Sequence, residues 1–201
     1  MTFMIKRYLL ISVFFTSCSS LDYSYFGDLK NYYSKNRIVV DQTFIDEKNY
    51  SFMKVSNSKN EAIFVLSTIN HLGIYEWIGS NNESIKTKDG LIIETKGMRS
   101  DIKFYSYDIS ILEITSSFKS QINLYNPDLI FANITIRRDS STSYINSEGS
   151  ELNVLKYTRI VPEIGWKAKE SYIFKDGVIY ESVQQINPML EPLELTFYFK
   201  Y

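Results

Sequence analysis

The sequence predicts a mainly β protein, folded as an antiparallel sandwich or a barrel-like sheet, with a short helical segment near its N-terminus. It contains 16 Tyr and 13 Phe against 8 Gly and 4 Pro, and aromatic and β-branched residues favour sheets. From Tyr50 onward, apolar and polar residues alternate with a period of two. No long helical pattern separates these runs, which argues against parallel βαβ units.

The first seventeen residues have the layout of a secretory signal peptide. Two cations, Lys6 and Arg7, precede an apolar run from Tyr8 to Phe15. This run is much shorter than the roughly 20 apolar residues that a transmembrane helix needs. We therefore expect residues 1–17 to be removed during export rather than to remain as a membrane span.

Cys18 is the predicted site of lipid attachment. Phe15-Thr16-Ser17-Cys18 resembles the lipobox of bacterial lipoproteins, with Phe15 in place of the usual Leu. The resemblance implies cleavage after Ser17, acylation of Cys18 and a lipidated tether over residues 18–22. Ser19, which is not Asp, implies sorting to the periplasmic face of the outer membrane. An incidental cysteine after an ordinary signal peptide is the alternative, but Cys18 is the only cysteine and no intramolecular disulfide can form.

The composition of the remaining chain limits its partners. Removal of residues 1–17 takes away two cations and no acid, which leaves a net charge of about −3. Without a basic excess, nucleic acid is a poor electrostatic partner. The length fits one ordinary domain or two small fused ones, and we predict a single mainly β periplasmic domain over residues 23–201.

Two short helices are predicted before the strands begin. Apolar side chains recur at spacings of three and four in residues 21–36, although Gly27 interrupts the pattern. A second helix is predicted from Asp41, a candidate N-cap, to about Lys48.

The strands are predicted by alternation and by turn residues. Asp89-Gly90 between two alternating runs is a strong hairpin signal, and a turn is expected at Glu148-Gly149. The predicted strands are Ala62–Ile69, Gly73–Ile78, Ser84–Lys88, Leu91–Thr95, Asp101–Ile109, Glu113–Tyr125, Ile130–Arg138, Leu152–Val161, Trp166–Phe174, Val178–Ile186 and Leu193–Phe199.

One segment recurs within the chain. Residues 88–95 read KDGLIIET and residues 175–182 read KDGVIYES, so five of eight positions are identical. Trp77 and Trp166 each precede a copy by about ten residues. The echo predicts two related halves, about 61–125 and 150–201. Independent use of the same hairpin sequence at two places in the chain would produce the same similarity without a duplication.

The residues of the chain give little support to catalysis or to a metal site. The single histidine, His71, and the single cysteine are too few for a His/Cys metal site, and no Gly-x-Ser-x-Gly or other nucleophile motif is present. We predict no catalytic residue, no metal and no cofactor. His71 is interpreted as a loop or packing residue.

Two further readings stay open. A carboxylate pair for glycan cleavage depends on three-dimensional separation, and Glu76, Glu94, Glu163 and Glu181 are read as solvated strand residues. Trp77 and Trp166 are candidates for contact with a glycan or a partner, since either could stack on a sugar ring. A Trp within an alternating strand is more often buried in the core.

Several motifs resemble the YjbF/GfcB family of lipoproteins, which is associated with exopolysaccharide and group 4 capsule export. An apolar strand, a Trp, a polar hairpin with an Asp-Gly turn and a Thr-x-Gly ending occur between residues 61 and 98. The C-terminal third adds Trp166, Tyr172, Asp176-Gly177-Val178, Ser182, Gln185 and Pro188, which are similar to the family's Trp, aromatic, Gly-x-Val, Ser-x-Gln and Pro sequence. Matching positions are Trp77, Gly90, Gly97, Trp166 and Gln185.

The resemblance implies a non-enzymatic accessory lipoprotein for exopolysaccharide or capsule production or export. Its partners would be the membrane, through the lipid anchor, and polysaccharide or outer-membrane export proteins. The resemblance implies that the five matched positions have structural rather than catalytic roles. Two alternatives are an outer-membrane assembly or adaptor lipoprotein that uses exposed aromatic strands, and a glycan-cleaving enzyme.

Overall fold

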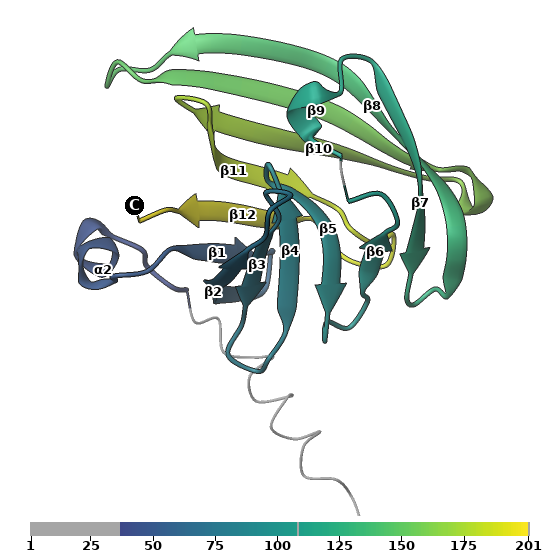
Figure 1. Ribbon diagram of the computed structural model, residues 1–201, viewed down its shortest axis with the longest axis horizontal. Coiled ribbons are helices and arrows are strands. Elements are labelled where there is room, and N and C mark those ends of the chain that lie inside the picture. Colours follow the sequence, from purple (N-terminus) through teal and green to yellow (C-terminus); the bar gives the residue numbers. More distant parts are fainter. Residues whose placement is uncertain (1–36, 108, 201) are drawn as a thin grey trace, which may run out of the picture. The chain divides into compact units, whose positions relative to one another are not determined.

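The computed structural model describes residues 37–107 and 109–200, which fold into an antiparallel sheet closed into a barrel (Figure 1). Each strand pairs with the next one along the chain, and the last pairs with the first. The described strands are β1 (Phe52–Ser56), β2 (Glu61–Ile69), β3 (Tyr75–Ile78), β4 (Ser84–Lys88), β5 (Leu91–Lys96), β6 (Ile102–Phe104), β7 (Ser117–Leu124), β8 (Leu129–Ile145), β9 (Glu151–Val161), β10 (Trp166–Lys175), β11 (Val178–Gln184) and β12 (Leu193–Tyr198). The predicted mainly β, antiparallel class is confirmed, and of the two predicted forms the structure adopts the barrel.

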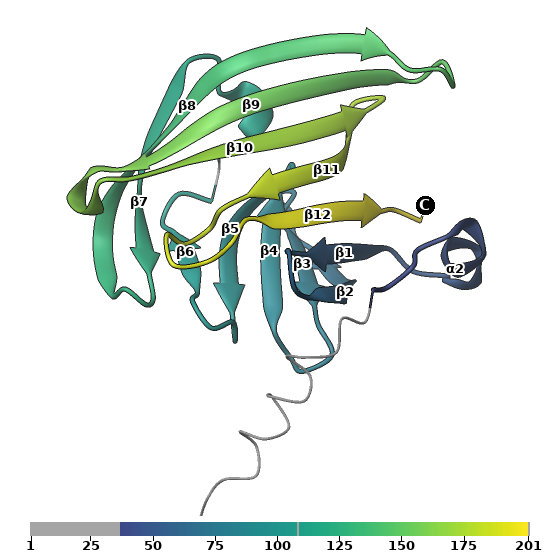
Figure 2. The same ribbon diagram turned by 180° about the vertical axis from the view of Figure 1, so that it is seen from behind.

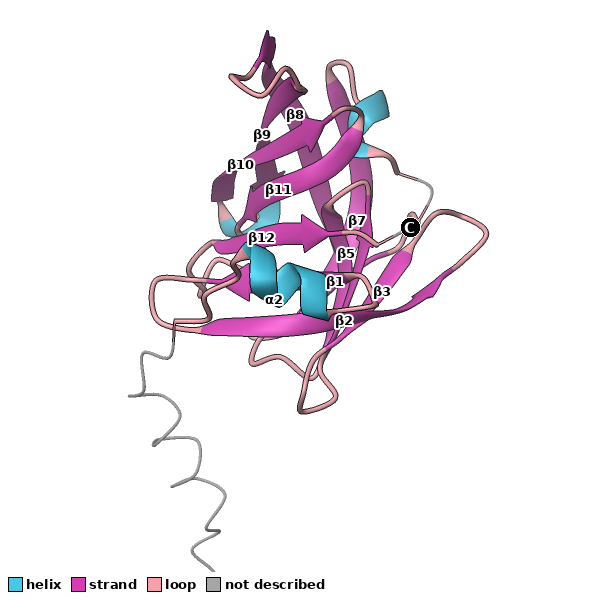
Figure 3. Ribbon diagram, turned by 90° about the vertical axis from the view of Figure 1, so that its left-hand side faces the viewer, coloured by secondary structure: helices cyan, strands magenta, loops and turns pink. Residues whose placement is uncertain are grey.

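The described α-helix, α2 (Gln42–Glu47), lies where the sequence predicted a second helix. The Asp41 side chain accepts a hydrogen bond from the Phe44 amide at 2.8 Å, so Asp41 is the N-cap. Phe44 contacts Phe52 of β1 edge to face, with ring centroids 5.5 Å apart, which fixes α2 to the barrel. Figure 3 shows α2 beside β1. The helix predicted over residues 21–36, the signal peptide and the tether lie outside the described residues.

The polar stretch 139–150 is more regular than its composition predicted. The turn at Glu148-Gly149 is present, but β8 continues through the hydroxyl-rich residues to Ile145 before it. Pairing with β9 from Ser140 to Ile145 holds these residues extended. Backbone pairing overrides the weak strand preference of serine, because strand formation depends strongly on context.

The two copies of the recurring segment form the same kind of hairpin. Asp89-Gly90 joins β4 to β5 and Asp176-Gly177 joins β10 to β11, with φ of 48° and 83° in one turn and 51° and 82° in the other. Positive φ at both central residues is the signature of a type I′ turn, which Asp-Gly favours. A common origin for the two halves stays a prediction.

The two hairpins meet, and Gly90 lies at their contact. A Cβ on Gly90 would lie 2.6 Å from Ile179 side-chain atoms of β11, so the contact requires glycine for space as well as for its φ. The Gln184 side chain of β11 bridges to β5: its Nε2 donates to the Gly90 carbonyl at 2.7 Å, and its Oε1 accepts from the Ile92 amide at 2.9 Å. Gln184 is fully buried. One side chain therefore satisfies the Ile92 amide of β5 and the Gly90 carbonyl of the turn before it.

The barrel has a seam between β5 and β6. These strands share a single paired position, Glu94 with Lys103. Glu94 is nearly buried and accepts a hydrogen bond from the Tyr107 hydroxyl at 3.2 Å. The ammonium groups of Lys96 and Lys86 lie 3.1 and 3.6 Å from its carboxylate. Side-chain contacts thus reinforce the seam where backbone pairing is sparse.

Electrostatics favour the charged form of Glu94. Burial acts to raise its pKa, but hydrogen bonding and charge attraction from Lys96, the charge of Lys86 and the bond from Tyr107 outweigh it. Together they hold the pKa of Glu94 below the ordinary value of 4.5.

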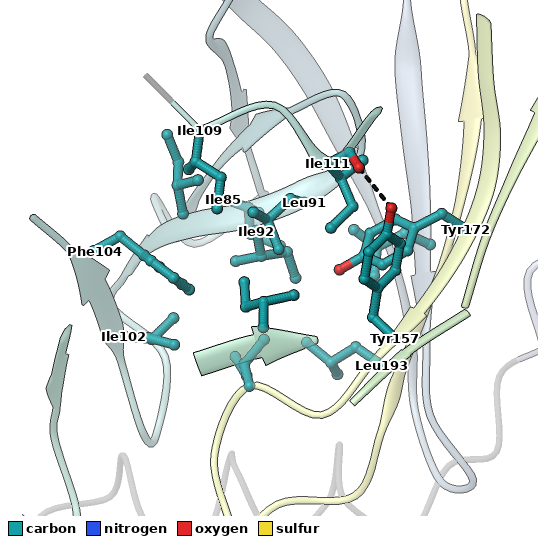
Figure 4. Close-up of a cluster of buried hydrophobic side chains, with 14 of the residues drawn as sticks. Ile85, Leu91, Ile92, Ile102, Phe104, Ile109, Ile111, Tyr157, Tyr172 and Leu193 are labelled. Carbon is teal, nitrogen blue, oxygen red and sulfur yellow. Dashed lines mark hydrogen bonds between the residues drawn. The ribbon is translucent and has the colours of Figure 1, made fainter. Parts of the chain in front are cut away.

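Apolar side chains fill the space between the two sides of the barrel. Figure 4 shows isoleucine and leucine side chains of β4, β5, β6 and the short 3₁₀ turn Ile111–Glu113 facing Tyr157 of β9 and Tyr172 of β10. The Tyr157 hydroxyl donates to the Ile111 carbonyl at 2.7 Å, which ties the 3₁₀ turn to the opposite side. The described interior is a packed core.

This core contains one fully buried ion pair. Nε of Arg159 lies 2.8 Å from Oε1 of Glu170, both side chains are inaccessible to solvent, and the Tyr172 hydroxyl donates to Glu170 at 3.0 Å. The guanidinium also lies over the Phe104 ring, 5.5 Å from its centroid. Breaking such a pair is costly because it leaves one charge buried alone, so Arg159 and Glu170 fix how β9 and β10 face β6.

Replacement of Gln184 with Leu removes the bridge but nearly keeps the volume. The Ile92 amide loses its side-chain partner, and a buried unsatisfied group costs about 1–3 kcal/mol. The Gly90 carbonyl keeps a hydrogen bond from the Ser182 hydroxyl at 3.4 Å. We predict that Gln184→Leu lowers the free energy of unfolding by about 1–3 kcal/mol, measured by urea denaturation of the full chain. Gln185→Leu is the matched control: Gln185 is half-buried and donates to the Leu190 carbonyl, so it should cost less. Equal losses would contradict the bridging role.

The lowered pKa of Glu94 predicts a specific pH dependence. Its stabilising contribution is complete above the unfolded-state pKa and is lost as the pH falls through the lower pKa of the folded state. Glu94→Gln should cost roughly 1–3 kcal/mol at pH 7 and should flatten the loss of stability below about pH 4.5. Glu76→Gln is the control, because Glu76 is more exposed and lies 3.9 Å from Lys86. An unchanged acid profile in Glu94→Gln would refute this assignment.

Candidate functional site

A row of polar side chains runs across the outer surface of the barrel. Neighbouring strands bring its members into register, with Glu76 opposite Lys86, Lys86 opposite Glu94 and Lys103 opposite Asn123. Glu94 joins the two halves of the row through its pairing with Lys103 at the seam. Adjacent strands are about 4.8 Å apart, so the row follows the circumference of the barrel from β3 to β7.

The row ends at two exposed aromatic rings, Tyr105 and Phe131. Tyr105 follows β6 and Phe131 lies near the start of β8, and the rings stack with centroids 4.7 Å apart and planes inclined by 23°. Tyr105 is 40% exposed and Phe131 is 55% exposed. We call this pair, with Asn123 of β7, the aromatic ledge.

Asn123 fixes both rings of the aromatic ledge. Its Nδ2 donates to the Tyr105 hydroxyl at 2.8 Å, and its Oδ1 accepts from the Phe131 amide at 2.9 Å. The Asn123 side chain is itself buried. Asn123 therefore holds the Tyr105 ring through its hydroxyl and the Phe131 backbone through its amide, and the Phe131 ring stacks on Tyr105.

The backbone of Phe131 has an unusual conformation. Its φ is 55°, in the left-handed region that a bulky residue rarely adopts. Such a conformation costs of order 1–3 kcal/mol and persists where the surroundings impose it, often at functional sites. Here the register shift between Ile122 and Leu124 and the bond to Asn123 impose it. The strain places the Phe131 ring over Tyr105.

A small hollow lies between the two Asp-Gly turns. It has a volume of about 150 Å³, and its lining includes Tyr75, Phe197, Phe199, Asp89 and Gly177. Typical ligand pockets have about 300–1,000 Å³, so this hollow is small for a saccharide chain. The lining contains one carboxylate, Asp89, which accepts a hydrogen bond from Ser110 at 2.6 Å. A carboxylate pair for glycoside cleavage would need a second acid.

Trp77 and Trp166, the candidates for contact with a glycan or a partner, are both buried in the barrel. Trp77 is 0% exposed, and its indole nitrogen donates to Thr87 at 2.9 Å. Trp166 is 7% exposed. Stacking on a sugar needs an exposed ring face, so neither indole offers a contact surface in this conformation. Trp77 packs against the rings of Tyr75, Phe197 and Phe199.

The other candidates from the sequence lie on different parts of the barrel, except Glu76 and Glu94. His71 is exposed in the turn after β2. Glu163 is exposed, and its bonds to Asn133 lower its pKa. Burial raises the pKa of Glu181, with a further contribution from the charge of Glu194. Glu76 and Glu94 both lie beside Lys86. The expectation that Glu94 is solvated was wrong: it is 4% exposed, because Lys86, Lys96 and Tyr107 cover its carboxylate.

The aromatic ledge was not among the sequence predictions. Period-two alternation places Tyr105, Asn123 and Phe131 within predicted strands, but it does not reveal which face is exposed or which rings meet across strands. The missed signal is Asn123, a polar residue of low strand preference between Ile122 and Leu124.

Two further possibilities for the described residues are a metal site and membrane-spanning helices. Among the described residues, no group of three or more His, Cys, Asp or Glu side chains is arranged to hold a metal ion. Over the same residues, no helix has the length and apolar character required to cross a membrane.

The chain matches known proteins by sequence and by fold. The family model described as group 4 capsule polysaccharide lipoprotein GfcB, YjbF matches residues 11–198. The hypothetical lipoprotein YmcC from Escherichia coli K12 has a similar fold, with a TM-score of 0.66 and 17% sequence identity over 91% of this chain and 97% of that one. No curated protein matches the sequence. The match across residues 11–198 shows that this chain belongs to the YjbF family of group 4 capsule polysaccharide lipoproteins.

Proposed function

We propose that this protein is a lipid-anchored accessory factor in capsule polysaccharide production or export, and that it binds glycan through the aromatic ledge. The observation that carries the proposal is the exposed, fixed ring pair of Tyr105 and Phe131. Family membership supplies the polysaccharide context. The proposed action is binding and not catalysis.

The chemistry of the aromatic ledge supports a saccharide ligand. An aromatic ring offers a flat apolar face, and the C–H-bearing face of a pyranose ring can pack against it. Ordering is complete before binding because Asn123 already fixes both rings, which reduces the entropy lost on association. The neighbouring polar row offers hydrogen-bond and charge partners for sugar hydroxyl and acidic groups.

The proposed location is the periplasmic face of the outer membrane, with Cys18 as the attachment point. Each buried acyl methylene contributes about 0.8 kcal/mol, and more than one chain gives stable anchoring. The lipoprotein family supports an anchored envelope location, and the residues around Cys18 support this particular site.

Loss of either ring should weaken glycan binding. We predict that Tyr105→Ala and Phe131→Ala each raise the Kd for capsule polysaccharide from the native host by about tenfold, or about 1.4 kcal/mol, measured by titration calorimetry on the full chain in detergent. Tyr105→Phe keeps the ring and should lose less. Tyr180→Ala, which removes an exposed tyrosine of β11, is the matched control and should bind normally.

Wild-type protein that fails to bind the purified polysaccharide would overturn the glycan proposal. Deletion of the gene tests the wider role separately: we expect less surface polysaccharide, restored by the wild-type gene and only in part by the Phe131→Ala gene. Unchanged surface polysaccharide in the deletion strain would contradict an accessory role.

The lipid anchor has a direct test by mass. Protein isolated from the native host should begin at Cys18 and carry the added mass of acyl chains, as measured by mass spectrometry. Cys18→Ser should leave residues 1–17 uncleaved and the protein unacylated. An unmodified Cys18, or an intact N-terminus in wild-type protein, would contradict the proposed anchor.

A further inference from the structure

The outer half of β8 is a strand edge that the barrel does not use. β7 pairs with β8 as far as Arg137, and the Arg138 amide makes the last bond to that side, with the Ser116 carbonyl. Beyond this point, β8 pairs with β9 alone among the described strands, from Ser140 to Ile145. Figures 1 and 2 both show this part of β8 at the outer margin of the sheet. We call residues 140–145 the β8 edge.

The backbone groups of the β8 edge that point outward can be identified. The Asn146 amide bonds to the Ser150 carbonyl across the hairpin, so residue 146 points its polar groups toward β9. In an antiparallel ladder this orientation alternates along the strand. Thr142 and Tyr144 therefore also bond toward β9, and Ser141, Ser143 and Ile145 direct their N–H and C=O groups away from it.

This edge lacks the features that usually prevent strand pairing. Natural edge strands are protected by charged residues, prolines or bulges. Residues 140–147 contain no charge and no proline. A register shift between Arg138 and Ser140, together with Asp139, marks the inner end of the unprotected stretch. Six residues, with side chains exposed along their length, are left free to pair.

The β8 edge is complementary to itself. In an antiparallel pairing centred on Ser143, outward-pointing residues meet outward-pointing residues, as the ladder requires. Ser141 then lies opposite Ile145, and Thr142 lies opposite Tyr144, an aromatic pairing with a β-branched residue that is favourable across strands. No charged residue lies opposite another of the same sign. A two-fold axis through this pairing gives a closed dimer.

We propose that two copies of this chain pair through their β8 edges to form a symmetric dimer. The sheet then continues from β9 and β8 of one copy into β8 and β9 of the other. A contact of this length is small, so the dimer is concentration-dependent, with a Kd of roughly 1–100 μM. The inference is independent of the aromatic ledge and of the glycan.

Sedimentation of the full chain in detergent tests the dimer. The protein-only mass should rise from monomer to dimer with concentration, and the amides of Ser141 and Ser143 should become protected from hydrogen exchange over the same range. Ser143→Pro removes an outward N–H that β9 does not use, and proline is tolerated at strand edges. It should raise the dimer Kd at least tenfold. Ser143→Ala keeps the amide and should dimerise like the wild type.

Three results would overturn the proposal. One is a monomer at every concentration. Another is a dimer that Ser143→Pro leaves unchanged. The third is a dimer in which Ser141 and Ser143 stay unprotected, which would place the contact elsewhere. The thermal unfolding midpoint of Ser143→Pro should match that of Ser143→Ala, so that a lost dimer is not mistaken for a lost fold.

Discussion

The seam between β5 and β6 is the constraint on which the rest of the barrel depends. A closed sheet needs every strand to find two neighbours, yet these two share one paired position. Gln184 supplies partners for the β5 backbone at one end, and Glu94 gathers two lysines and Tyr107 at the other. Of these contacts, the hydrogen bond from Tyr107 to Glu94 crosses the seam and adds to its sparse backbone pairing. Gln184 and Glu94 are themselves buried, where hydrogen bonds face little competition from water.

The same seam connects the architecture to the proposed binding surface. Lys103 pairs with Glu94 on one side and with Asn123 on the other, and Asn123 orients Tyr105 and Phe131. The interior is packed with apolar side chains and a buried ion pair. The proposed contact with a long polymer therefore lies on the outer wall, where the strands hold the contacting groups at fixed spacing.

Local signals in the sequence predicted local structure well. Asp-Gly predicted the two hairpin turns, Asp41 predicted the start of α2, and alternation predicted most strands. What the sequence did not predict depends on contacts between distant residues: closure of β1 on β12, the Gln184 bridge 92 positions from Ile92, and the stacking of Tyr105 on Phe131. The family motifs point to Gln185, but the side chain that joins the two hairpins is its neighbour Gln184. Residues 105, 123 and 131 lie outside those motifs.

Closure through β1 and β12 has a consequence for biogenesis. Phe52 and Tyr198 are paired and their rings stack 4.7 Å apart, so the first and final strands complete each other. The barrel therefore cannot close until β12 has been synthesised. A chain that ends before β12 leaves β1 and β11 each with an unpaired edge, and unpaired edges are sites of aggregation.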